Sequence, residues 1–183
     1  PVTKTFEYTA EGAAVENYAL NSGNSAPRGV ARALAGDKVW VADANKNVYV
    51  YDNAGLLLGS WAAGSLASNA SVRGIATDGT DVWLVDSQSD KVYRYAGAAS
   101  RTSGSQNAAS SFSLNSSNGD ADDLVTDGAS LWVLNNGLFT EKVFKYNLSG
   151  SLQGSWTING INNSPTGIAL DPASVSHLWI VDS

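Results

Sequence analysis

The stretch that decides the fold of this chain is VWVADANKNVYVYDNAG, which runs from Val39 to Gly55. Both apolar halves are rich in Val, and the second, Val48 to Tyr51, alternates β-branched with aromatic residues. That alternation has the period of two of a β-strand. The first half ends in Asp43, and a short polar segment connects it to the second. The stretch therefore predicts two consecutive strands joined by a short loop.

The same pattern recurs three more times along the 183 residues. The copies read VWLVDSQSDKVYRYAGA from Val82, LWVLNNGLFTEKVFKYNLSG from Leu131 and, shortened, LWIVDS from Leu178. Each copy carries a tryptophan at its second position, and successive tryptophans are 43, 49 and 47 residues apart. A repeat of this length indicates an architecture in which each repeat forms one structural unit.

Further strand candidates flank each copy. A short apolar stretch precedes it, and the four stretches are Gly29-Val30-Ala31, Gly74-Ile75-Ala76, Asp123-Leu124-Val125 and Gly167-Ile168-Ala169. Tight turns such as Asp78-Gly79 or Asp171-Pro172 separate the stretch from the copy. A glycine-containing turn and a fourth strand follow, as in Leu56 to Trp61. Four strands in about 45 residues match one blade of a β-propeller.

The two ends of the chain carry complementary parts of one further blade. Lys4 to Tyr8 matches a third strand and Val15 to Leu20 a fourth, whereas the residues from Gly167 to Asp182 match a first and a second. Pairing strands from both ends in one sheet would leave no free strand edge. We therefore expect one blade to be split between the two ends of the chain.

These observations predict one all-β domain over 1–183, a β-propeller of four four-stranded blades. The blades cover approximately 28–66, 73–115, 122–160, and 166–183 plus 1–22. Two alternatives stay open at this point. Two chains could complete a larger ring, such as one of eight blades, or the chain could be an arc of a longer propeller.

The repeat resembles the NHL-type repeat, whose second strand ends in Asp and leads through an Asn-containing loop to a third strand. The resemblance is weaker in the third repeat, where Asn135 replaces the Asp and the loop lengthens through Gly137 to Thr140. Proteins with such blades include scaffolds that bind proteins or RNA, extracellular modules of bacterial surface proteins, and a few related lyases and hydrolases. The resemblance thus implies a propeller and favours binding, without fixing a ligand.

Composition narrows the classes of function. The chain has 11 Lys and Arg against 17 Asp and Glu, a net charge of −6, which argues against a general surface for nucleic acid or anionic membranes. No apolar run approaches the 18 residues of a membrane-spanning helix. Without cysteine there is no disulfide or zinc–thiolate site, and the one histidine, His177, is expected in an exposed turn. The absence of Met favours a processed or excised piece of a longer product.

Charged residues gather where the predicted first strands begin. Arg28 and Arg73 precede the first two of these strands, and Asp122 and Asp123 occupy the equivalent place in the third. First strands line the axis of a propeller, so these four are candidate ligand-binding residues at one mouth of the central channel. Alternatively, they pair with one another and connect neighbouring blades. Asp120, Asp122 and Asp123 are the candidates for a calcium site, and no other metal or cofactor is expected.

The repeated residues have structural interpretations. We expect the four second-strand tryptophans to pack between blades. The residues that end the second strands should accept hydrogen bonds from backbone N–H groups of the following turn; they are Asp43, Asp86, Asn135 and Asp182. The Ser-, Ala- and Asn-rich segment 98–118 is predicted to be a long flexible loop, which leads to a fourth strand at Ser111 to Leu114.

No catalytic set is assembled in the sequence, so we expect a non-catalytic binding or interaction module of a larger bacterial extracellular or cell-surface protein. Its partner would be a protein, a small molecule or a carbohydrate, without nucleic acid or membrane insertion, and a homodimer is expected if two chains complete the ring. One alternative is a lyase or hydrolase with an acidic site at the channel mouth, similar to streptogramin lyases. The other is a structural spacer, or a chain made to study how propellers assemble.

Overall fold

The computed structural model describes residues 3–9, 11–33, 36–137, 141–171 and 174–183. These residues form an all-β structure, as predicted, and the only helical element described is the 3₁₀ turn η1 (Ala98–Ser100). The strands form five separate sheets, three complete and two with only two strands. Two details of the prediction, the centre of the long loop at 138–140 and Pro172 of the last turn, lie outside the described residues.

The three complete sheets each contain the four antiparallel strands predicted for one repeat. The first contains β3 (Pro27–Arg32), β4 (Lys38–Asp43), β5 (Asn47–Asp52) and β6 (Leu57–Ala63). The second contains β7 (Val72–Thr77), β8 (Val82–Asp86), β9 (Lys91–Tyr95) and β11 (Ser110–Ser113). The third contains β12 (Ala121–Thr126), β13 (Ser130–Asn135), β14 (Lys142–Asn147) and β15 (Leu152–Thr157).

The Asp-Gly turns between first and second strands are built from local hydrogen bonds. Gly79 has a φ of +90°, a conformation that favours glycine. The carboxylate of Asp78 accepts the backbone N–H groups of Thr80 and Asp81, both at 2.8 Å. The turn at Asp127 repeats the same bonds to the two residues that follow Gly128. The turn is therefore a property of the repeat sequence itself.

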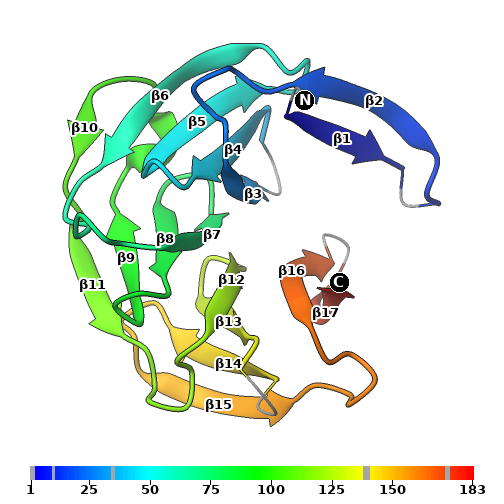
Figure 1. The fold of residues 1–183 in the computed structure, drawn as a ribbon, viewed down its shortest axis with the longest axis vertical. Helices are drawn as coiled ribbons and strands as arrows, with labels where there is room; N and C mark the ends of the chain where they lie inside the picture. The colour runs from blue at the N-terminus through cyan, green and yellow to red at the C-terminus, as the bar shows by residue number, and fades with distance from the viewer. Residues whose placement is uncertain (1–2, 10, 34–35, 138–140, 172–173) are drawn as a thin grey trace.

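The sheets are arranged side by side in an open arc (Figure 1). Their first strands, β3, β7 and β12, lie on the inner side, and each contacts the first strand of the next sheet. The third of these contacts is between β12 and β16 (Pro165–Asp171). Between neighbouring sheets lies a buried apolar layer, in which Ile75 joins the cluster of Trp40, and Leu124 that of Trp83. Burying one such side chain contributes about 1.5–3 kcal/mol.

The two ends of the chain form half-sheets at opposite ends of this arc (Figure 1). One half-sheet pairs β1 (Lys4–Tyr8) with β2 (Ala14–Ala19), and the other pairs β16 with β17 (Ser174–Asp182). They belong to separate sheets, so the predicted split blade is not formed within this chain. Each sheet follows the previous one along the arc, and this succession leaves the two half-sheets apart. The arc therefore ends in two separate half-sheets and does not close into a ring of four sheets.

The segment 98–118 is more ordered than the sequence predicted. Its fourth strand is confirmed, since β11 pairs antiparallel with β9. The preceding residues are not a free loop, however, because Ala98 and Ala99 are buried in the layer between the first two sheets. In addition, β10 (Ser105–Gln106) pairs in parallel with β6 as a fifth strand of the first sheet. Small side chains and a strand edge thus hold this segment in place.

Candidate functional site: the inner rim and the groove at the open end

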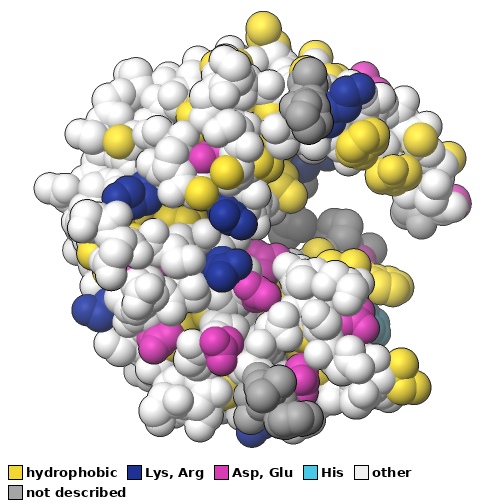
Figure 2. All heavy atoms as spheres, in the orientation of Figure 1, with side chains coloured by type: hydrophobic (Ala, Val, Ile, Leu, Met, Phe, Trp, Pro, Cys, Tyr) yellow, Lys and Arg dark blue, Asp and Glu magenta, His cyan; other side chains and the backbone are white. Residues whose placement is uncertain are grey.

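The predicted channel-mouth residues lie on the inner rim of the arc, where Figure 2 shows basic and acidic side chains next to each other. Arg73 of β7 forms an ion pair with Asp122 of β12, at 3.8 Å between the guanidinium nitrogen and a carboxylate oxygen. The side chains are 43% and 23% exposed, so water screens this pair. Asn136 donates a hydrogen bond to the same carboxylate, at 3.2 Å. This geometry agrees with the alternative in which rim charges connect neighbouring blades.

Asp123 also connects two sheets, through backbone groups. Its carboxylate accepts the N–H of Leu124 at 2.8 Å and the N–H of Ile168, on the half-sheet β16–β17, at 3.0 Å. Burial, together with the weaker effect of the nearby charge of Asp122, raises the pKa of Asp123 to about 7, although the two N–H bonds lower it. Gly74 allows this close packing, because a Cβ there would lie 2.8 Å from the Cα of Asp123.

The remaining rim residues do not join a common site. Arg28 and Asp120 are both exposed, and the hydrogen bonds of Asp120 run through its backbone to Asn135 and Asn136. Within the described ranges, no group of three or more acidic or His side chains is arranged to hold a metal ion. Of the three aspartates proposed for calcium, Asp122 contacts Arg73 and Asn136, whereas Asp123 accepts backbone N–H groups. Ligand binding by Arg28, Arg73, Asp122 and Asp123 stays a prediction.

Two of the four residues that end the second strands, Asp43 and Asp86, accept hydrogen bonds from the following turn as predicted, and they also bind a residue before the first strand. Asp43 accepts the N–H of Asn45 in the following turn at 2.9 Å, and that of Ala26, just before β3, at 2.8 Å. Asp86 makes the corresponding bonds to Gln88 and Ser71. These carboxylates connect the residue before the first strand to the end of the second strand. Asp43 and Asp86 are both buried in this position.

Two sequence interpretations require correction. Trp40, Trp83 and Trp132 are buried between sheets as predicted, but Trp179 is 68% exposed, because no sheet packs on the outer face of β17. His177 is exposed, although it lies within the long strand β17 instead of in a turn.

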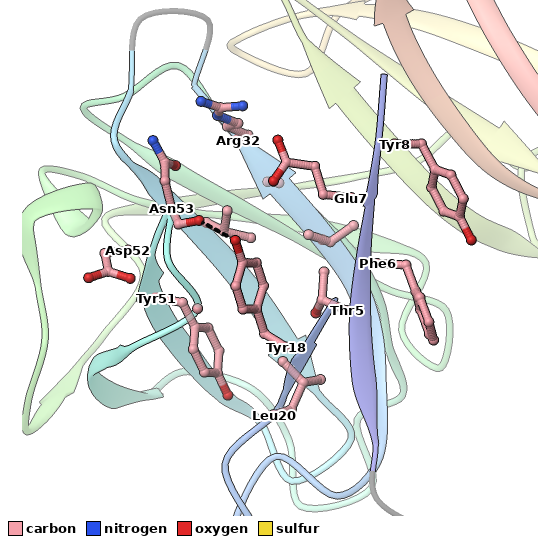
Figure 3. A pocket seen from close by; sticks show the side chains of 14 residues that line it. Thr5, Phe6, Glu7, Tyr8, Tyr18, Leu20, Arg32, Tyr51, Asp52 and Asn53 are labelled. Atoms are coloured by element: carbon pink, nitrogen blue, oxygen red, sulfur yellow. Dashed lines mark hydrogen bonds between the residues drawn. The ribbon is translucent and has the colours of Figure 1, made fainter. Parts of the chain in front are cut away.

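A groove lies at the open end of the arc, between the half-sheet β1–β2 and the first complete sheet (Figure 3). It has a volume of about 340 Å³ and is lined mainly by apolar and aromatic side chains. Thr5 and Glu7 of β1 and Tyr18 of β2 point towards the first complete sheet, which contributes Tyr51, whereas Phe6 and Tyr8 point to the opposite side of β1 (Figure 3). We call this groove the end groove. Side chains of β1–β2 form one wall, and the first complete sheet, including Val30 of β3, forms the other.

Packing against the first sheet fixes the position of β1–β2. The Tyr18 hydroxyl donates a 2.8 Å hydrogen bond to the carbonyl of Asn53, and the hydroxyl of Tyr51 accepts the N–H of Asn21 at 3.1 Å. Tyr18 also lies against Gly55, where a Cβ would approach its ring to 2.1 Å. Leu20 completes this contact in a buried cluster with Tyr51. The outer half of a blade is therefore in place, and the groove occupies the position of its inner half.

Sequence reasoning missed the end groove. It assigned β1–β2 to a complete blade, which would bury Phe6 and Tyr8, yet both side chains are 58% exposed. The repeat pattern contains no signal for this, since Tyr8 occupies the same position as the buried Tyr95 and Tyr146. Exposure here follows from a missing neighbour, which a local sequence pattern does not encode.

Comparisons with known proteins identify the fold alone. No protein-family model matches the chain, and no curated protein matches its sequence. Among solved structures it is similar to the hydrazine synthase of Kuenenia stuttgartiensis, with a TM-score of 0.58 and 13% identity over 84% of this chain. It is also similar to U3-55K, with a TM-score of 0.55 and 12% identity over 78% of this chain. The chain corresponds to 41% and 42% of these proteins' lengths.

Both similar structures are of the β-propeller type, which agrees with the radial sheets of this chain. The similarity covers most of the chain but at low identity, so it supports the propeller-like fold and carries no ligand or activity with it. Across the described part of the chain, no helix has the length and apolar character needed to cross a membrane.

Proposed function

We propose that this chain is a non-catalytic interaction module of the propeller type, which binds a polypeptide partner in the end groove. One observation carries the proposal: an apolar groove of about 340 Å³ lies beside the unpaired edge of β1. A free strand edge offers a row of backbone N–H and C=O groups, and an extended segment that adds to it gains hydrogen bonds along its whole length. The neighbouring apolar wall would accept its alternate side chains.

The groove also carries features that would orient such a segment. Glu7 of β1, Arg32 of β3 and Asp52 of β5 bring two acidic side chains and one basic side chain to its rim (Figure 3). Val30 is 60% exposed at its inner wall, so an apolar contact is available there without a rearrangement. A small number of charges around an apolar floor is the usual composition of a binding site.

Several finer assignments belong to the same proposal. We infer NHL-type repeats from the form of the second and third strands, and membership of a larger bacterial extracellular or cell-surface protein from the low charge and the Ser- and Asn-rich surface. Closure into four blades is an alternative use of the same strand edges, in which β17 would pair with β1 of its own chain. Calcium at Asp120, Asp122 and Asp123 is an untested addition that the proposal does not need.

A lyase or hydrolase at the inner rim is the second candidate. The observation in its favour is the pKa of about 7 for Asp123, a value suited to proton transfer. Against it, both carboxylate oxygens of Asp123 accept backbone N–H groups. A general base needs a free oxygen directed towards a substrate. The interaction module is therefore the better supported function.

The test is a binding experiment with a defined strand-forming probe. An acetylated peptide of alternating Val and Thr, with Lys at both ends for solubility, is titrated into isotope-labelled chain while backbone amide shifts are recorded. We expect shifts along β1 and around Val30, and their loss in Val30→Asp. Ile161→Asp is the matched control, since Ile161 is 86% exposed and lies outside the end groove. Shifts spread evenly over the surface, or unchanged in Val30→Asp, would contradict the proposal.

A further inference from the structure

We propose that the partner of the end groove is the half-sheet β16–β17 of a second copy of this chain, so that copies associate head to tail. The inference rests on the proposed function and names its partner. It follows from three sets of exposed groups, each divided between the two ends of the arc. Figure 2 shows apolar side chains at each of these ends. The first two sets repeat contacts that are already buried between neighbouring sheets, and the third repeats a strand pairing within a complete sheet.

The first set joins a first-strand residue to a second-strand tryptophan. Ile75 packs in the cluster of Trp40, Leu124 in that of Trp83, and Ile168 in that of Trp132. The equivalent residues that remain are Val30, 60% exposed, and Trp179, 68% exposed. They lie at opposite ends of the chain, and each lacks the neighbour that the other would provide. Placing β16–β17 in the end groove brings Trp179 of one copy onto Val30 of the next.

The second set is an aromatic pair. Trp61 of β6 contacts Tyr95 of the following sheet edge-on, with 5.1 Å between ring centroids, and both rings are buried. The equivalent residues at the ends of the arc are Trp156 of β15, 42% exposed, and Tyr8 of β1, 58% exposed. Tyr8 points away from its own sheet (Figure 3). It would therefore meet Trp156 of the copy that supplies β16–β17.

The third set is the pair of free strand edges. Second and third strands pair in one register in the complete sheets, with Val85 opposite Val92 and Asp86 opposite Lys91. The same register between copies places Val181 opposite Thr5, and Asp182 opposite Lys4. Each strand would then bury its unpaired backbone groups, and Asp182 would lie opposite Lys4 at the position where Asp86 lies opposite Lys91. The complete blade would have the order β16-β17-β1-β2.

A second copy is favoured over closure within the chain, because the halves lie at opposite ends of an arc whose four sheet-to-sheet contacts are already packed. Bringing them together within the chain would require each of these buried layers to bend further. A second copy needs no such change. The contact joins different surfaces of the two copies, so it generates a ring if the rotation closes and a longer assembly if it does not.

The experiment uses mass and directed crosslinking. Light scattering after size exclusion should give at least about 38 kDa at high concentration, against 19.0 kDa for one chain. The chain has no cysteine, so single variants Val181→Cys and Thr5→Cys can be mixed. Opposite positions of paired strands lie within the Cα distance of a disulfide. We expect a crosslinked heterodimer from this mixture, and little from Val181→Cys mixed with Val15→Cys, which lies on β2.

Two outcomes would overturn the inference. A mass of 19.0 kDa at every concentration, with no crosslinked heterodimer, would show that copies do not associate through these edges. A disulfide formed within one dilute chain of the double variant Thr5→Cys/Val181→Cys would show closure inside the chain instead. Either result leaves the proposed function intact if the strand-forming peptide still shifts the amides of β1, so the two proposals fail separately.

Discussion

The complete sheets and the half-sheets are built from the same repeat, yet they bury it differently. Trp83 of a complete sheet is fully buried, whereas Trp179, at the same place in the half-sheet β16–β17, is 68% exposed. Tyr95 and Tyr8 form a second such pair, with exposures of 0% and 58%. Their immediate sequences are alike, so the difference arises from the neighbouring sheet. In this architecture each sheet contributes only half of a core, and the next sheet contributes the other half.

The sharpest way to break this comparison is to remove the tryptophan at both places. Trp83→Ala should lower the free energy of unfolding by about 3–5 kcal/mol, because it leaves a cavity between two sheets. Trp179→Ala should change it by less than about 0.5 kcal/mol in dilute chain, where nothing covers this side chain. Urea denaturation of both variants at low concentration measures the difference. Equal losses would mean that β17 is covered in solution.

A second comparison uses the strand-ending aspartates. Asp86 is buried and accepts hydrogen bonds from the N–H groups of Ser71 and Gln88 and from the Ser89 hydroxyl. Asp182 is exposed and accepts the N–H of Ser164. Asp86→Ala should lower the free energy of unfolding by about 2–4 kcal/mol, since it leaves three partly buried donors without their acceptor, and Asp182→Ala by about 1 kcal/mol or less. Hydrogen exchange at Ser71 and Ser164 would locate each loss, and a larger effect at Asp182 would contradict the comparison.

These pairs also show what the sequence could predict. Hydrophobic alternation around Val48 to Tyr51, the Asp-Gly turns and the regular tryptophans located the strands of the complete sheets, because these are local signals. The capping role of Asp43 and Asp86 was predictable for the same reason. By contrast, the order in segment 98–118 depends on a parallel pairing of β10 with β6, and the pattern of the repeat has no place for it.

The candidate sites were harder to predict because they depend on how far each sheet turns relative to the next. The sequence placed Arg73 and Asp122 together correctly, since both begin first strands of neighbouring repeats. It did not predict that Asp123 would turn towards the backbone of Ile168, or that the end groove would stay open. The turn per sheet is the sum of many side-chain contacts, and no single residue specifies it.

Asp123 gives a third prediction, at the contact between a complete sheet and a half-sheet. Its pKa is about 7 when folded and 3.8 for an unperturbed Asp, so between these values the folded chain retains a proton that the unfolded chain has released. The free energy of unfolding should therefore fall as the pH rises from about 4 to 7, and stay lower above 7. Asp123→Asn should flatten this slope.

Thermal unfolding across pH 4 to 8 checks the prediction. Asp127→Asn is the control, because the Asp127 carboxylate accepts N–H groups of Ala129 and Ser130 within its own turn, whereas Asp123 accepts one from another sheet. An unchanged slope in Asp123→Asn would show that another group releases the proton, and it would also remove the one property that favours catalysis at the rim.

The smallest expected effect concerns the two arginines that begin first strands. Arg73 lies between complete sheets and pairs with Asp122 at 3.8 Å, whereas Arg28 is exposed at the open end. Arg73→Ala should cost about 0.2–1 kcal/mol, an amount that shrinks as salt is added, because both partners are partly exposed to water. Arg28→Ala should cost nothing measurable in dilute chain. If Arg28→Ala instead costs as much as Arg73→Ala and the loss is sensitive to salt, Arg28 has a charged partner in solution. That partner would then cover the open end of the arc.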